Sequence, residues 1–585
     1  MCNLRWFLLS LLVCFTSVTT ADEYHARLLV PRSVKSARAT EEQTTEYWVD
    51  KAQSILADKL EQSSRPNTNR AKNIIFFLGD GMSVHTITAT RAFLGDSSEQ
   101  VSFEQFPYTG LSKTYSINKL VPDSASTSTA YLSGVKANYG TIGVTAQVPK
   151  SDCEAAIDKR THTESIAKWA QDAGKWAGLV TTARVTHASP AGVYAHTANR
   201  DWETDSKIKS SGCVSGAEHN VDIASQLVEW PVGKNLRVIM GGGRRNFIDE
   251  EELDEEGIEG KRSDGRNLTA EWLADKYEQG ASAAYVWNKN GLLNVNLDKT
   301  EYLLGLFSSS HCPYHGDLER EGLTETVPSL RKMTEAAIQL LRNNDKGYFL
   351  FVEGARIDMA HHSNRPHRSF EDTAEFARAI ELARKMTNEE DTLIVVTSDH
   401  SHTMTINGYP TRGSDIFGLA PMTADDNLPY TILSYANGPG FSKTYSTKKG
   451  RRDLTDADLD DPKYRYMATV PLDSETHGGD DVGVFASGPY AHYFSGNYEQ
   501  TIIPALMAYA ADIGPFAKSA LADAEAMEPT MEPAIEPAME PTMEPTKNVS
   551  VVNKGMKVQS SAAYKFVLLS ILEVVLFRPQ NSSWS

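Results

Sequence analysis

Acidic residues and histidines gather at the ends of three apolar runs in this chain. Asp80 ends the run IIFFLGD, Glu353 ends YFLFVE, and Asp399 with His400 ends LIVVTSDH. Each run is typical of a short strand buried on both faces, and parallel sheets built from such strands place ligands at the carboxyl ends of the strands. One edge of the sheet would then collect carboxylates and imidazoles, which together can hold more than one divalent ion. The pattern predicts a metalloenzyme with several metal ions.

Further histidines and an aspartate follow these runs. Asp358 and His362 are four residues apart, so one helical turn would place both on the same face, where they could grip one ion. We expect His361 to point elsewhere and His402 to be a bystander. His477, in ETHGGDDVGVF, is a loop histidine that carries little information by itself. The alternative to a metal site is a solvated polar loop.

Ser124 and Arg200 are candidates for nucleophile and anion clamp. Ser124 starts a helical stretch in VPDSASTSTAYLSG, so it would lie in the positive field of a helix N-terminus. No GxSxG elbow surrounds it, and as a nucleophile it would need a metal to lower its pKa. The alternative is a helix-capping serine, just as Asp80 could be a helix-capping aspartate. Arg200 could grip two oxygens of a tetrahedral anion, or form an ordinary surface ion pair.

The remaining pattern from about residue 71 to 516 alternates strands with helices, which is the rhythm of a parallel sheet. Further strands are expected at 177–182 and 236–240. Helices are expected at 45–62, 124–133, 163–173 and 329–342. The stretch 402–474 is rich in Gly, Pro and Asp, and it interrupts the rhythm. We interpret it as an insertion with its own small β-rich subdomain.

Both ends of the chain look like processing or tail segments. Arg5 precedes an apolar run that is too short for a comfortable membrane span, which predicts a signal peptide at 1–21 and an extension or pro-segment at 22–40. Pro and Glu recur in tetrads between residues 527 and 546, which predicts a semi-extended stalk at 517–560. The tail at 561–585 fits either a partly helical end of a secreted protein or a lipid-anchor signal.

Removal of the signal peptide would leave three cysteines. In an oxidising compartment two of them should pair, and we favour Cys153 with Cys213 because both lie in polar, loop-like sequence. Cys312 would stay a free thiol. Asn267 and Asn548 begin glycosylation acceptor motifs that suit export. We therefore expect an extracellular protein, secreted or attached to the outer face of the cell membrane.

The charge balance limits the classes of partner. The formal net charge of the 585 residues is −18, which argues against nucleic acid or an anionic membrane surface. It does not argue against a phosphate ester, because bound cations can reverse the sign of the field inside a site.

Several motifs together resemble the animal alkaline phosphatases. They are VPDSASTSTAYLSGVKANYGTIGV, TTARVTHASPAGVYAHTANRDW, FVEGARIDMAHH, TSDHSH and ETHGGDDVGVFASGP. The resemblance covers roughly Lys72 to Ile513 in one order. It implies an α/β fold with a doubly wound, mostly parallel sheet and helices on both faces, a catalytic domain at 41–516 and a crown-like domain at 402–474. It also implies a homodimer in which an N-terminal arm at 41–70 embraces the other subunit.

The resemblance further implies two Zn²⁺ and one Mg²⁺ per subunit, each with its own set of ligands. The ligands of the first zinc ion would be Asp358, His362 and His477. The ligands of the second zinc ion would be Asp80, Asp399, His400 and Ser124. The ligands of the magnesium ion would be Asp80, Ser189 and Glu353.

The remaining roles also follow from the resemblance. Ser124 would be the nucleophile and Arg200 the phosphate clamp, while His187 and Asp123 would support the site without binding an ion. Met359 stands where vertebrate members carry a histidine, so the tuning of the neighbouring zinc ligand is expected to differ.

A structural calcium site, which vertebrate members build with carboxylates, is doubtful in this chain. Ser308 and Val327 stand at two of those positions, and a serine and a valine are poor replacements for anionic oxygens.

The resulting hypothesis is hydrolysis of small phosphate monoesters through a covalent phosphoserine. One alternative is a related hydrolase that cleaves phosphodiesters or sulfate esters on the same metal scaffold. A second is a catalytically silent surface glycoprotein, which would be expected to have lost some of the ligands.

Overall fold

The structure is a computed structural model that describes residues 41–95, 98, 100–216 and 219–521. The expected signal peptide, the extension at 22–40, most of the stalk and the whole C-terminal tail lie outside these residues. Among the described residues, no helix is both long and apolar enough to cross a membrane.

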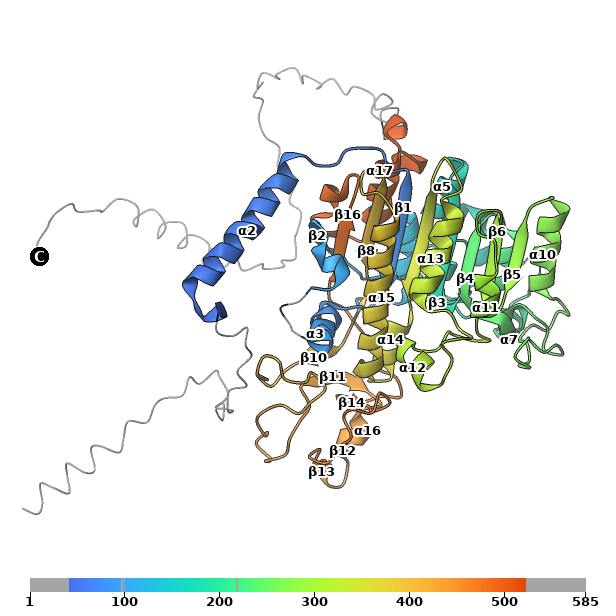
Figure 1. Cartoon of the computed structure of the whole chain (residues 1–585). Coiled ribbons are helices and arrows are strands. Elements are labelled where there is room, and N and C mark those ends of the chain that lie inside the picture. Colours follow the sequence, from blue (N-terminus) through green and yellow to red (C-terminus); the bar gives the residue numbers. More distant parts are fainter. Residues whose placement is uncertain (1–40, 96–97, 99, 217–218, 522–585) are drawn as a thin grey trace, which may run out of the picture. The chain divides into compact units, whose positions relative to one another are not determined.

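A ten-stranded, mostly parallel sheet forms the centre of the fold (Figure 1). Its strand order is β17-β2-β16-β8-β1-β7-β3-β4-β6-β5. β16 is antiparallel to both of its neighbours, and all other pairs are parallel. The strands are β1 (Asn73–Gly79), β2 (Tyr108–Lys113), β3 (Trp176–Arg184), β4 (Val238–Gly242), β5 (Ala283–Val286), β6 (Tyr302–Leu306), β7 (Tyr348–Gly354), β8 (Thr392–Thr397), β16 (Val482–Ser487) and β17 (Gly496–Glu499).

Helices cover both faces of this sheet, as expected for a doubly wound fold. Alternate residues of β1 enter two separate apolar clusters: Ile74 and Phe76 belong to one, and Ile75 and Phe77 belong to the other. This alternation follows from the two-residue period of a strand. The first cluster includes residues of α4 (Ser124–Ser133), α5 (Ile166–Asp172), α6 (Ala188–Ala191), α8 (Ile223–Glu229), α10 (Leu268–Glu278) and α17 (Ile502–Ala511). The second includes residues of α3 (Val84–Leu94), α11 (Lys289–Leu293), α12 (His315–Arg320), α13 (Leu330–Leu341), α14 (Arg356–His362) and α15 (Pro366–Met386).

The expected elements agree with the observed ones to within a few residues. The strands expected at 177–182 and 236–240 are β3 and β4, and the helix expected at 124–133 has the observed bounds of α4. The helices expected at 163–173 and 329–342 are α5 and α13, which are a little shorter. Several short helices were not expected, among them α7 (Asp205–Ser210) and α9 (Pro231–Lys234).

The stretch 402–474 carries small sheets of its own, in line with the expected β-rich insertion. A three-stranded sheet pairs β11 (Leu433–Gly438) with β10 (Met404–Ile406) and β14 (Met467–Pro471). A short ladder joins β12 (Tyr445–Ser446) to β13 (Gly450–Arg451), next to α16 (Phe441–Thr444). Outside the stretch, β15 (His477–Gly478) returns to pair with β9 (Ser401–His402), which brings two histidines into register.

The N-terminal helix α2 (Thr45–Ser64) begins at Thr44, whose side chain caps the N–H of Tyr47. Its apolar side chains Trp48, Ile55 and Leu56 are at least half exposed within this single chain. A globular helix normally buries its apolar stripe, so this face is suited to contact another surface.

Cys153 and Cys213 form a disulfide, and Cys312 is a buried free thiol, both as expected. The bridge closes a loop across a sequence separation of 60 residues, which contains the segment that leads to Arg200. Loops of this length lose much chain entropy on closure, so the bridge stabilises the folded state mainly by constraining the unfolded chain.

Candidate metal and catalytic site

The three strands that end in acidic clusters are neighbours in the sheet. β1 lies between β8 and β7, and Leu78 pairs with both Glu353 and Thr397. Asp80, Glu353 and Asp399 therefore leave the sheet at the same edge. All three carboxylates are fully buried. This edge is the candidate site.

The first group of ligand atoms centres on Asp358 at the start of α14. Its Oδ1 lies 3.3 Å from Nε2 of His362 and 3.3 Å from Nε2 of His477. Asp358 and His362 are one helical turn apart, as the spacing predicted, whereas His477 arrives on β15 from more than a hundred residues later. The two imidazole Nε2 atoms are only 3.1 Å apart.

Hydrogen bonds determine which ring nitrogen of His362 and His477 carries the proton. Nδ1 of His362 lies 2.5 Å from the carbonyl oxygen of Glu475, and Nδ1 of His477 lies 2.8 Å from that of Pro122. A carbonyl can only accept, so each Nδ1 carries the proton and each Nε2 presents a lone pair. Burial also lowers the pKa of both histidines, which keeps them neutral. Two facing lone pairs beside a carboxylate form a cation site.

The second group surrounds the hydroxyl of Ser124. Its Oγ lies 3.2 Å from Nε2 of His400 and 3.5 Å from Oδ1 of Asp80. Nε2 of His400 is also 3.0 Å from Oδ2 of Asp399. The backbone N–H of Gly81, in the tight turn after β1 where φ is +66°, donates to the other oxygen of Asp399 at 2.9 Å. Ser124 is the first residue of α4, as predicted.

The third group has buried polar atoms without partners. Oδ2 of Asp80, Oε1 of Glu353, Oγ of Ser189 and Nδ1 of His187 form no hydrogen bond with any described residue. Ligand atoms of Asp80, His187 and Glu353 lie within 4.8 Å of one another. Buried oxygens left without a partner are costly. A hard cation with oxygen ligands would satisfy them, so the residues fit a magnesium ion.

The pKa shifts of the buried carboxylates show which part of the site lacks positive charge from the chain. Burial and then the neighbouring carboxylates raise the pKa of Asp80 well above its usual range, and burial raises the pKa of Glu353 to about 8. Asp358 is also buried, but its pKa lies well below the usual value because imidazoles surround it. His362 is adjacent, and His402, whose own pKa Glu475 raises to about 10, lies 2.8 Å from its Oδ1. The Asp80–Glu353 side therefore has the greater need for a cation from outside the chain.

Asp123 connects the serine to the arginine. It is the N-cap of α4, where its Oδ1 accepts hydrogen bonds from the N–H groups of Ser126 and Gly140. Its Oδ2 accepts a 3.0 Å bond from Nη1 of Arg200. Burial alone would raise the pKa of Asp123, but Arg200 and these N–H donors hold it below the usual value. The carboxylate of Asp123 thus fixes both the start of α4 and the position of the Arg200 guanidinium.

His402 is part of the site, so the expectation that it is a bystander is wrong. Its Nε2 lies 2.8 Å from Oδ1 of Asp358, and its Nδ1 lies 2.5 Å from Glu475. Glu475 was missed altogether, although it is buried and also accepts from the N–H of Thr403. The alternation HSH on a strand could have indicated that His402 and His400 lie on the same side.

His361 points away from the ligand groups, as predicted. Its two ring nitrogens contact the hydroxyls of Thr86, Ser369 and Tyr435. Met359 lies beside Arg356, whose guanidinium donates to the methionine sulfur at 3.0 Å.

The residues at the two questioned calcium positions, Ser308 and Val327, make other contacts in the structure. Val327 is buried in the apolar cluster that contains α13 and α15. The carbonyl oxygen of Ser308 accepts from the N–H groups of Gly243 and Arg244. Neither position offers a carboxylate.

Comparisons with known proteins agree with this geometry. A family model described as "Alkaline phosphatase" matches residues 71–513. The chain belongs to the alkaline phosphatase family. The membrane-bound alkaline phosphatase of Bombyx mori is 46% identical over 512 residues, which are 85% of this chain and 91% of that protein. The human tissue-nonspecific isozyme is 44% identical over 488 residues, 81% of this chain and 90% of the isozyme. The chain is therefore an enzyme of the phosphoric monoester hydrolase type.

Solved structures of bacterial family members have the same fold. The alkaline phosphatase of Thermus thermophilus matches with a TM-score of 0.53 at 24% identity, over 76% of this chain and 92% of that one. The enzyme of the Antarctic bacterium TAB5 matches with a TM-score of 0.51 at 22% identity, over 76% and 99%.

We expect His402→Ala to weaken zinc retention about 10- to 100-fold, because partners that orient a metal ligand tune its affinity. Glu475 and Asp358 would both lose the imidazole that lies between them. Zinc competition against a chelator measures the change, with His492→Ala as a matched histidine outside the site. Equal zinc affinity in the wild type and His402→Ala would show that His402 does not support zinc binding.

Proposed function

We propose that this enzyme hydrolyses phosphate monoesters through a phosphoserine at Ser124, with two zinc ions and one magnesium ion in the site. The observation that carries the proposal is the position of Ser124. Its hydroxyl starts a helix and lies within 3.5 Å of both His400 and Asp80, next to the guanidinium that Asp123 holds. These contacts support a role for Ser124 as nucleophile and for Arg200 as anion binder.

The three ligand groups would each hold one ion. Asp358, His362 and His477 would bind the first zinc ion. Asp80, Asp399, His400 and Ser124 would bind the second. Asp80, Ser189 and Glu353 would bind the magnesium ion. When bound, such ions lower the pKa of coordinated hydroxyls and stabilise negative charge on the attacking and leaving oxygens.

The residues of the chain position the reaction. Oγ of Ser124 attacks phosphorus as its proton leaves, and the bond from phosphorus to the ester oxygen breaks. The leaving alkoxide takes up a proton and departs as an alcohol. Water then attacks the phosphoserine, which regenerates Ser124 and releases inorganic phosphate. Arg200 would hold two oxygens of the transferring group, where most of the charge is carried.

His187 would act between the arginine and the magnesium group. Its Nε2 lies 3.4 Å from Nη2 of Arg200, and a guanidinium can only donate, so Nδ1 carries the proton. That N–H is buried without a partner among the described residues. It is suited to donate to an oxygen beside the ion and not to coordinate the ion, which agrees with the supporting role expected from the sequence.

We expect Ser124→Ala to lower turnover of nitrophenyl phosphate by ~10³-fold or more and to abolish the phosphoenzyme, because the nucleophile is lost. Acid trapping of the labelled phosphoenzyme measures the intermediate directly. Ser128→Ala is the matched control, because that serine lies in the same helix and donates to the carbonyl of Ala125. Normal turnover in Ser124→Ala would refute the nucleophile assignment.

We further propose a homodimer in which α2 packs on the second subunit. The half-exposed apolar side chains of Trp48, Ile55 and Leu56 support this assignment. Secretion, with the chain free or lipid-anchored outside the cell, is part of the same proposal. The disulfide supports it, because such bridges persist in oxidising compartments.

Charged substitutions on this face should break the dimer. We expect Ile55→Asp with Leu56→Asp to shift the protein to monomers, because two carboxylates would be buried without partners. Light scattering after size exclusion measures the mass, and Asp50→Asn on another face of α2 is the control. A double variant that stays dimeric at low micromolar concentration would overturn the role of α2.

A further inference from the structure

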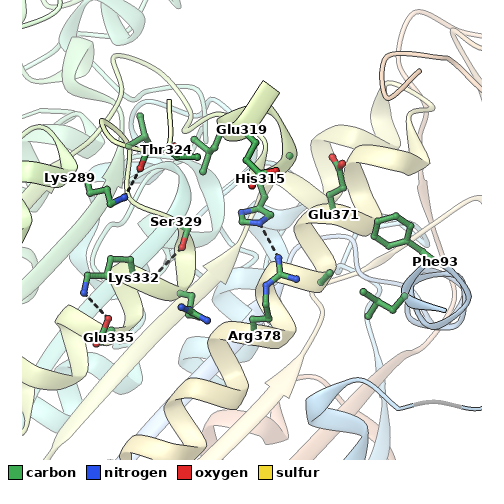
Figure 2. A pocket seen from close by; sticks show the side chains of 16 residues that line it. Phe93, Lys289, His315, Glu319, Thr324, Ser329, Lys332, Glu335, Glu371 and Arg378 are labelled. Carbon is green, nitrogen blue, oxygen red and sulfur yellow. Dashed lines mark hydrogen bonds and ion pairs between the residues drawn. The ribbon is translucent and has the colours of Figure 1, made fainter. Parts of the chain in front are cut away.

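Two cavities of about 540 and 550 Å³ lie outside the catalytic site and share none of its proposed residues. The first, shown in Figure 2, lies against α13 and α15. Several of its charged side chains already have partners of opposite charge: Lys332 pairs with Glu335, Arg378 with Glu375, and Glu371 with Arg320. The lining thus carries side chains of both charges.

The second cavity has a different character, and we call it the tryptophan cavity. Its walls include His162, His196 and Trp230, which are half-buried, and its rim includes the exposed Lys159. Volumes of this size hold a small organic ligand. A smaller cavity of about 260 Å³ lies along the same three rings. The rings therefore have accessible surface on more than one side.

The three rings pack against one another and together form one wall of the cavity. His162 and His196 stack with centroids 4.5 Å apart and an interplanar angle of 9°. Trp230 lies 6.0 Å from His162 and 5.7 Å from His196, tilted by about 30° from each. His162 and His196 cover each other's inner faces, so a planar ligand would pack against the outer side of this group of rings.

Both wall histidines are neutral. Nε2 of His162 donates to the carbonyl of Ala156 at 3.0 Å, and Nδ1 of His196 donates to the carbonyl of Gly143 at 2.7 Å. Burial lowers the pKa of His162, and burial together with His162 lowers the pKa of His196 to about 4. The stacked wall is therefore uncharged at neutral pH.

Lys159 sets the charge preference of the tryptophan cavity. Among the described residues, no Asp or Glu lines this cavity, although the whole chain carries a net charge of −18. Lys159 forms no ion pair with any described residue, so its ammonium group remains available at the rim. A negative group on a ligand could therefore pair with this ammonium group.

The indole N–H of Trp202 is a buried hydrogen-bond donor in the lining of the tryptophan cavity. Trp202 lines the cavity, is 1% exposed, and its indole N–H has no partner among the described residues. Buried indole N–H groups normally find an acceptor. A ligand with an acceptor atom at the deep end could supply one after a small shift of the lining.

We propose that the tryptophan cavity binds a small planar aromatic anion, whose ring stacks on Trp230 and the histidine pair and whose negative group faces Lys159. A ring carboxylate is the simplest member of this class, because a phosphate ester would be consumed at Ser124. In the sequence, His196 of the tryptophan cavity precedes Arg200, the proposed phosphate clamp, by four residues.

Calorimetric titration of the metal-loaded enzyme with 2-naphthoate tests the proposal. The titration is done with saturating inorganic phosphate, so that the active site is occupied. We expect binding to persist under phosphate, to weaken about tenfold in Trp230→Ala as stacking is lost, and to weaken about threefold in Lys159→Gln as the exposed ion pair is lost. Cyclohexanecarboxylate, which has the charge but no aromatic ring, should bind at least about fivefold more weakly than 2-naphthoate.

Control variants separate binding from folding. Trp230→Phe keeps a ring and should recover most of the affinity lost in Trp230→Ala, while Lys207→Gln removes a lysine elsewhere on the surface and should change nothing. All four variants should keep the wild-type turnover of nitrophenyl phosphate, which shows that they fold. Displacement of 2-naphthoate by phosphate, or equal affinity in Trp230→Ala and the wild type, would overturn the proposal.

Discussion

Four buried carboxylates and the lone pairs of several imidazoles meet at one edge of the sheet, and the rest of the site depends on how that charge is balanced. Asp80, Glu353, Asp358 and Asp399 are at most 4% exposed. His402 pairs with Asp358 at one end of the cluster. At the other end, no lysine or arginine among the described residues forms an ion pair with Asp80 or Glu353, and the pKa of both carboxylates is raised. Buried charge on this scale is stable only when it is paired or bound to metal. The cluster is thus arranged for cations that the chain must acquire.

Asp123 is the buried carboxylate that positions Ser124, the proposed nucleophile. It caps α4 and ties Gly140 into place, so Ser124 cannot move without disturbing both. Its second oxygen holds Arg200, a residue that reaches the site from 77 positions further along the chain. A single buried acid therefore helps to set the distance between Ser124, the proposed nucleophile, and Arg200, the proposed phosphate clamp. Preorganisation of this kind is the main source of catalysis in phosphoryl transfer.

The sequence predicted the parts of the site that are local. Apolar runs identified β1, β7 and β8, and the four-residue spacing of Asp358 and His362 placed both on α14. The interactions that escaped prediction join residues far apart, such as His402 with Glu475, 73 positions later. Their geometry depends on how β9 pairs with β15 after a long insertion, and no local period encodes that pairing. The family resemblance supplied the remaining ligands, and their roles stay proposals.

The elemental composition of the purified, dialysed protein tests the central claim most directly. The account predicts about two zinc ions and one magnesium ion per chain, together with a lower thermal unfolding midpoint after chelation, because the bare carboxylates would repel one another. Protein that contains no divalent metal, unfolds at the same temperature and still hydrolyses phosphate esters would contradict it.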